Sequence, residues 1–255
     1  MEGFVVEIPA SVVFMLGPIP ITNTIIAAWL AMAVLIVVSV LATRKMELVP
    51  RGLQNVAEFA VESLLSICEQ VAGPRGREFL PLVGTLFLFI LIANWMGILP
   101  FWAESNWIHH GVHWTHDHGP PLRSANSDLN IPLAMAAIVA VWVQWLRIRS
   151  SGFLGWLKHL TIGPPPLLEL ISEISRPVSL ALRLFGNIFA GGVLVYVMTE
   201  LTKLVVPIIF MSFELFVGIV QALIFASLTL AFMSLAAAEH GAEHSSSEEH
   251  PRASH

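Results

Sequence analysis

An arginine lies inside one of the most apolar stretches of the sequence, between residues 167 and 200. Arg183 has Leu180-Ala181-Leu182 on one side and Leu184-Phe185 on the other. A guanidinium keeps its proton in proteins, and at the centre of a bilayer it costs from about 2.5 to more than 10 kcal/mol. The position therefore predicts a functional site in which another group compensates for this charge.

The next apolar stretch, residues 203–238, repeats the pattern with different chemistry. Glu214, Gly218 and Gln221 are spaced by four and then three residues, which puts them on one face of a helix. The face of Arg183 is small and polar, and small residues allow another helix to approach closely. It comprises Ser172, Ser175, Ser179, Gly186, Asn187 and Ala190. We expect the two polar faces to meet, and a neighbouring helix can bring a carboxylate near the arginine.

The composition is that of a membrane protein. Of the 255 residues, 56% are apolar and only 12% are charged, and the mean hydropathy is +0.76. Several apolar runs reach the roughly 20 residues that are needed to cross a hydrocarbon layer of about 30 Å. The net charge of −5 comes from separated clusters and gives no indication of nucleic-acid binding. We predict a chain that crosses the lipid bilayer more than once.

The sequence has no motif for catalysis or for binding a cofactor. Cys68 is the only cysteine, which excludes an intramolecular disulfide and argues against a thiolate metal site. No Gly-x-x-x-x-Gly-Lys-Ser/Thr loop occurs, so any ATP chemistry belongs to other chains. We predict a non-catalytic protein with no cofactor and no bound metal.

The predicted fold is an all-α membrane protein with a long, strongly tilted C-terminal helical hairpin. Three transmembrane spans cover residues 21–43, 79–101 and 129–149, and an amphipathic cytoplasmic-side helix covers 49–72. The hairpin joins helix 167–200, about 51 Å long and so longer than the hydrocarbon layer is thick, to helix 203–238. An outer N-terminal segment 1–20, an outer His-rich loop 102–128 and a disordered cytoplasmic tail 239–255 complete the chain.

The basic residues indicate the orientation, because lysine and arginine collect on the cytoplasmic side of membrane proteins. Only Arg123 and Lys203 fall on the outer side. We therefore expect the N-terminus outside and the C-terminus in the cytoplasm, in a multi-pass protein of a bacterial inner (plasma) membrane. Pro9 and Gly17 interrupt the first apolar stretch, which argues against a cleaved signal peptide. The cytoplasmic basic residues are Arg44, Lys45, Arg51, Arg75, Arg77, Arg147, Arg149 and Lys158.

One continuous segment resembles a known family. Residues 176–191, RPVSLALRLFGNIFAG, are similar to the signature helix of subunit a of the rotary, F-type ATP synthase membrane sector. The similarity extends to residues 221–225 (QALIF), 94–100 (NWMGILP) and 127–130 (SDLN), and it covers about residues 48–238. The resemblance implies a subunit that translocates an ion, expected to be a proton, and not an enzyme in itself.

The resemblance also implies a mechanism and partners. The chain would be a stator with two long, nearly horizontal helices that work against a rotating ring of c subunits, each with a membrane-embedded carboxylate. Arg183 would face this ring and separate two offset half-channels, so that ions cross only when the ring turns and ion flow drives ATP synthesis. The b-type peripheral stalk subunits and the remaining ATP synthase subunits would be further partners.

Two sets of site residues follow from the residue patterns and the resemblance. Many members of the family carry an acidic residue where this chain has Gly192, and a histidine where it has Glu214. We therefore hypothesise that Glu214 relays protons in the outer half-channel. Gly97 stands where some members have a further acid. The predicted ion-translocation residues are Arg183, Glu214, Gln221, Asn187, Asn94 and Asp128, and the inner half-channel candidates are Glu169, Glu173 and Arg176.

Each of these residues also has a purely structural explanation. Arg183 could snorkel to the interface or pair two helices, and Glu214 could be a protonated packing carboxyl. The amides could serve only to hold neighbouring helices together by hydrogen bonds. A carboxylate that precedes a helix could be the N-cap of that helix. The residues concerned are the amides Asn94, Asn187 and Gln221, the carboxylate Asp128, and Glu169, Glu173 and Arg176 as ordinary interfacial charges.

Two other functions are compatible with a multi-span membrane protein: secondary transport, and metal sensing or a structural role. A secondary transporter with a midplane substrate site is often revealed by inverted repeats, and we find none. A metal-sensing or structural membrane protein would use the outer loop rather than Arg183. The histidines of this loop are spaced so that their imidazoles could converge on zinc. The spacing is not distinctive, and a solvated loop explains these histidines as well. The loop histidines are His109, His110, His113, His116 and His118.

Overall fold

Helices dominate the computed structural model of the chain, which describes residues 12–98, 123–162, 166–202 and 205–248. The main helices are α1 (Asn23–Thr43), α2 (Leu53–Ala72), α3 (Gly76–Ile98), α4 (Asn130–Ile162), α5 (Pro166–Thr202) and α6 (Val205–Glu248). Two short 3-10 helices, η1 (Gly73–Arg75) and η2 (Ala125–Ser127), precede α3 and α4. Within the described residues, five helical segments are long and apolar enough to cross a membrane. The predicted all-α membrane fold is confirmed.

One element outside the helical pattern is a short hairpin. Strands β1 (Val12–Leu16) and β2 (Ile19–Thr22) pair antiparallel and lead directly into α1. They occupy part of the region that was expected only as an outer N-terminal segment. The branched and aromatic side chains of β1 favour an extended backbone.

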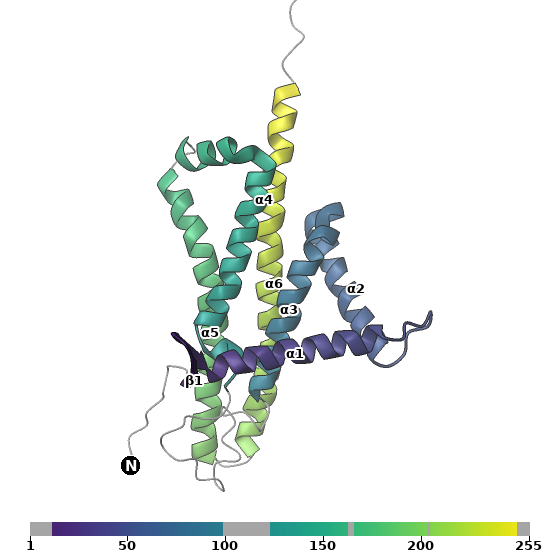
Figure 1. Cartoon of the computed structure of the whole chain (residues 1–255), viewed down its shortest axis with the longest axis vertical. Coiled ribbons are helices and arrows are strands. Elements are labelled where there is room, and N and C mark those ends of the chain that lie inside the picture. The colour runs from purple at the N-terminus through teal and green to yellow at the C-terminus, as the bar shows by residue number, and fades with distance from the viewer. Residues whose placement is uncertain (1–11, 99–122, 163–165, 203–204, 249–255) are drawn as a thin grey trace, which may run out of the picture.

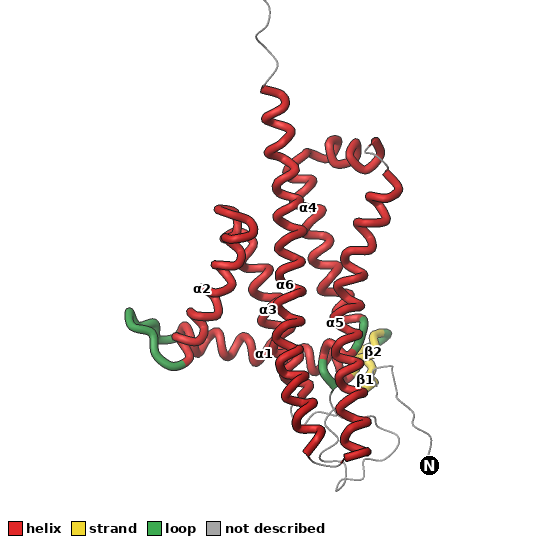
Figure 2. Tube along the Cα trace, turned by 180° about the vertical axis from the view of Figure 1, so that it is seen from behind, coloured by secondary structure: helices red, strands yellow, loops and turns green. Residues whose placement is uncertain are grey.

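Helices α4, α5 and α6 run side by side along the long axis of the molecule, and α3 packs against α6 (Figure 1). The interior between α3, α5 and α6 is filled by large apolar side chains, among them Ile90, Leu184 and Phe225, which are almost completely buried. Helix α1 runs across the other helices in both views (Figure 2). Helix α1 has the highest mean hydropathy of the five apolar segments, and the tilt of the α5–α6 pair in the bilayer stays a prediction.

Two helices extend past the boundaries that we expected from the sequence. Helix α4 continues beyond residue 149 to Ile162 through a kink at Gly152, whose φ of 70° is a conformation that suits glycine. Its last part crosses one end of the α4–α5 pair (Figure 1). Helix α6 continues to Glu248, so residues 239–248, expected to be disordered, are helical. Alanines 236–238 are strong helix formers, and a helix that has begun gains one hydrogen bond for each residue added.

Candidate functional site

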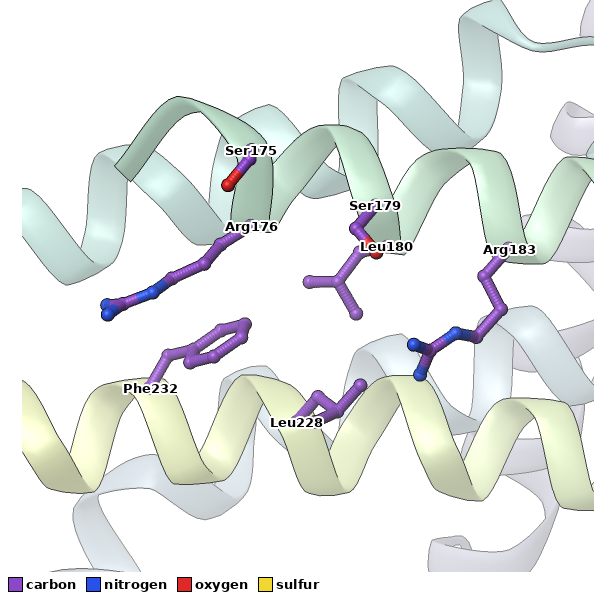
Figure 3. Close-up of a pocket in the computed structure, with 7 residues that line it drawn as sticks. All are labelled: Ser175, Arg176, Ser179, Leu180, Arg183, Leu228 and Phe232. Atoms are coloured by element: carbon purple, nitrogen blue, oxygen red, sulfur yellow. The ribbon is translucent and has the colours of Figure 1, made fainter. Parts of the chain in front are cut away.

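Arg183 lies in a hollow between α5 and α6 (Figure 3). This groove has a volume of about 370 Å³, and the guanidinium of Arg183 points across it toward α6. The Arg183 side chain is exposed, and within the described part of the chain it makes no hydrogen bond or ion pair. No side chain among the described residues therefore compensates for its charge. The groove is lined by Ser175, Arg176, Ser179, Leu180, Arg183, Leu228 and Phe232.

The packing of α5 explains why Arg183 faces outward. Leu180, Leu184 and Ile188 recur every four residues and are buried in the core, which fixes the rotation of the helix. On the opposite side, Gly186 and Ala190 are exposed, as the sequence predicts for a small-residue face. Asn187 lies at the edge of this face and is half-buried.

Glu214 of α6 packs directly against the backbone of α5. A Cβ built on Gly191 would lie only 2.6 Å from Glu214 Oε1 and 3.0 Å from its Cδ, so a side chain there would collide with the carboxyl group. Glu214 itself is half-buried. Gly191 follows Arg183 by eight residues, or about 12 Å along the helix. The carboxyl group and the guanidinium thus belong to the same pair of helices without contacting each other.

This close approach gives a first prediction. Gly191→Ala is expected to displace the Glu214 carboxyl and, if the chain translocates ions as the resemblance implies, to lower ion pumping by about 10- to 100-fold, because a misplacement of about 1 Å can cost as much as 100-fold. Pumping per assembled complex in membrane vesicles is the measurement. Gly84→Ala is the matched control, because its Cβ would meet Leu64 and Leu80 at an ordinary 3.8 Å. Wild-type pumping by Gly191→Ala would contradict the importance of this contact.

Asn94 is buried between α3 and α6. Its Nδ2 donates to the carbonyl oxygen of Gly218 at 3.2 Å, and its Oδ1 accepts from Asn126 Nδ2 at 2.6 Å. Gly218 is one helical turn from Glu214, so this amide chain ends beside the carboxyl-bearing face of α6. Asn126 was not among the predicted residues. Its only sequence signal is the polar run Ser124-Ala125-Asn126-Ser127 before an apolar span.

Asp128 joins the start of α4 to the start of α1. Its Oδ2 accepts from Thr24 Oγ1 at 3.1 Å, and its Oδ1 accepts from the backbone N and the Nδ2 of Asn130, each at 3.0 Å. The bond to the Asn130 backbone is of the kind that caps a helix N-terminus.

The buried Gln221 shares the face of Glu214, and its Nε2 has no hydrogen-bond partner among the described residues.

The three candidates for the inner half-channel lie in different surroundings in the structure. Arg176 lines the groove, and its Cζ lies 5.5 Å from the ring centroid of Phe232. Glu173 is not part of the groove lining and instead pairs with Arg147 of α4. Glu169 lies in α5, but its side chain is outside what the structure describes. The loop histidines also lie outside the described residues, among which no group of three His, Cys, Asp or Glu side chains could hold a metal ion.

These features define a class of protein, a multi-pass helical membrane protein with an exposed arginine in a groove between two long helices and no partner for it among the described residues. A model of the family described as ATP synthase A chain matches residues 25–234. ATP synthase subunit a of Gloeobacter violaceus is 36% identical over 242 residues, 94% of each chain. That of Moorella thermoacetica is 34% identical over 224 residues, which cover 87% of this chain and 94% of the relative.

A third relative, ATP synthase subunit a 2 of a Bradyrhizobium species, is 35% identical over 231 residues, 89% of this chain and 94% of the relative. The chain belongs to the ATP synthase A chain family. The matched region includes every residue of the candidate site, from Asn94 to Gln221.

Proposed function

We propose that this chain is the ion-translocating subunit of the ATP synthase membrane sector and that it acts with the other subunits of that complex. The observation that carries the proposal is Arg183, an exposed arginine on an apolar helix with no partner among the described residues. Such a charge is stable only if a partner or water compensates for it. A ring of c subunits, each with a membrane-embedded carboxylate, supplies that partner.

The role of Arg183 is electrostatic. A fixed positive charge favours the ionised form of each ring carboxylate that passes it, and it therefore prevents a proton from moving directly between the two half-channels. The attraction must remain breakable so that the ring can turn. The serines of the groove, Ser175 and Ser179, are exposed and can hold water at this face, which weakens the ion pair.

The outer half-channel runs along the carboxyl-bearing face of α6. Glu214 is its titratable group and exchanges protons with the ring. Gln221, with an amide nitrogen free to donate, and Asn187 of α5 line the path toward Arg183. Asn94 is held by Asn126 and provides polar surface one turn from Glu214, while Asp128 holds α4 against α1 at the outer end.

The inner half-channel is the groove between Arg176 and Arg183, with Glu169 on the same helix toward the cytoplasm. The N-terminus lies outside and the C-terminus in the cytoplasm of a bacterial plasma membrane, because this orientation puts most of the lysines and arginines inside. Each proton that crosses releases about 2.3 kcal/mol per 100 mV of membrane potential. The b-type peripheral stalk subunits hold this chain still while the ring turns.

A direct test is to purify the complex that contains this chain and to reconstitute it in lipid vesicles. We expect an oligomeric ring of small subunits in the preparation and acidification of the vesicle lumen when ATP is added. A preparation that lacks such a ring would overturn the proposal. Solute uptake by this chain without any ATP synthase subunit would favour the secondary transporter instead.

A further inference from the structure

A buried cluster of charges ties α4 to α5 close to the groove. Arg147 Nη1 of α4 donates to Glu173 Oε1 of α5 at 2.5 Å, and Gln144 Nε2 of α4 donates to the other oxygen of Glu173. Arg176 Nη1 donates to Glu173 Oε1 at 3.3 Å. The side chains of Arg147 and Glu173 are only 10% and 11% exposed. This is an ion pair shielded from water rather than a surface contact.

The hydrogen bonds around Glu173 do not suit an ion carrier. Both of its oxygens already accept from donors, and two of the three donors are guanidiniums, which keep their protons. A relay group must turn between a donor and an acceptor, and Glu173 cannot turn without breaking its buried ion pair with Arg147.

Through Arg176 the cluster reaches the groove and α6. Arg176 lies over the ring of Phe232 and lines the same groove as Arg183 (Figure 3). The two arginines are seven residues apart, which is two helical turns, so they share a face of α5. A contact that fixes the rotation of α5 at Glu173 therefore also fixes the direction in which Arg183 points.

We propose that Glu173 is a positioning residue, which locks the rotation of α5 against α4 and does not carry ions. The proposal rests on the proposed function, because it is the pull of passing ring carboxylates on Arg183 that α5 must withstand. A ring carboxylate that attracts Arg183 exerts a torque on α5 about its own axis. The buried pair with Arg147 transfers this load to α4, which stays in place.

Exchanging the two charges tests the lock. Arg147→Glu and Glu173→Arg each bring like charges together in a buried site, and each is expected to lower the number of protons pumped per ATP hydrolysed by about tenfold. The double variant restores an opposite pair and is expected to recover at least about half of the wild-type ratio. The ratio is measured on complexes that have assembled, so a loss that only reduced their amount would not change it.

The double variant also separates a lock from an ion carrier. It moves the carboxylate from α5 to α4, so a carrier at residue 173 is lost while the pair remains. Failure of the double variant to recover the pumping ratio, or an unchanged ratio in both single variants, would overturn the proposal. If the single variants do not assemble, Arg147→Gln with Glu173→Gln replaces them, because this pair is neutral. If Glu173 only positions α5, this neutral pair is expected to retain at least about half of the wild-type pumping ratio, since replacing both charges of a buried pair is often neutral. If Glu173 carries ions, no pumping is expected.

Arg183→Ala in the same assay distinguishes the two proposals from each other. If Arg183→Ala pumps normally, the proposed function is wrong whatever the charge exchange does. If Arg183→Ala does not pump and the exchanged pair fails to recover, only the role assigned to Glu173 is wrong.

Discussion

Arg183→Ala is expected to abolish ATP-driven proton pumping, with a decrease of at least about 100-fold, which corresponds to roughly 2.7 kcal/mol. Two opposite charges about 4 Å apart near a protein surface interact by about 4 kcal/mol, so the loss of one charge removes at least the roughly 2.7 kcal/mol expected here. The passive proton permeability of the membrane sector is expected to rise at the same time, because nothing then separates the two half-channels. Arg183→Lys keeps the charge but not the planar guanidinium, and we expect it to pump poorly as well.

Inverted membrane vesicles allow both effects to be measured, with ATP-driven acidification in one assay and passive proton uptake after removal of the catalytic sector in the other. Arg149→Ala is the matched control. Arg149 is an exposed arginine whose Cζ lies 5.2 Å from the ring centroid of Trp145, away from the groove. Normal pumping by Arg183→Ala would contradict the assignment. If deletion of His109 to His118 abolished pumping in that case, the outer loop would carry the function.

Glu214→Gln is expected to lower pumping by about 10- to 100-fold, or roughly 1.4 to 2.7 kcal/mol in the barrier, because the amide has nearly the same shape but cannot exchange a proton. Glu214→His is expected to retain more activity than Glu214→Gln, because imidazole titrates near neutral pH. The measurement is the initial rate of ATP-driven acidification divided by the amount of assembled complex.

Glu62→Gln provides the control for this variant, because Glu62 is an exposed carboxylate on α2 and takes no part in the site. Equal pumping by Glu214→Gln and Glu62→Gln would show that Glu214 only packs against α5. A histidine variant as inactive as the glutamine variant would show that the position requires a carboxylate and not merely a titratable group.

The sequence predicts the features that depend on one helix at a time. The cost of a charge in hydrocarbon singles out Arg183, and the spacing of serines and small residues predicts the polar side of α5 on which it lies. The helical periods also place Glu214 and Gln221 on one face of α6. These arguments need only the geometry of a single helix and the thickness of a bilayer.

Contacts between helices could not be predicted in the same way. The approach of Glu214 to Gly191, the bond between Asn126 and Asn94, and the pairing of Glu173 with Arg147 each depend on how two helices are rotated and shifted against each other. A change of one residue in that register alters every such contact. Glu173 shows the consequence, because its position on α5 suggested an interfacial charge or a channel residue, whereas two of its partners, Gln144 and Arg147, lie on α4.

The contact between Glu214 and Gly191 has a consequence for how relatives of this chain are compared. Residues on two facing helices, Gly191 on α5 and Glu214 on α6, share one small volume, so any larger residue at 191 requires the side chain at 214 to move or to be smaller. Substitutions at 191 and at 214 are therefore expected to be coupled. Conservation in this region is therefore better assessed by the space that side chains occupy than by sequence position, with α5 and α6 considered together.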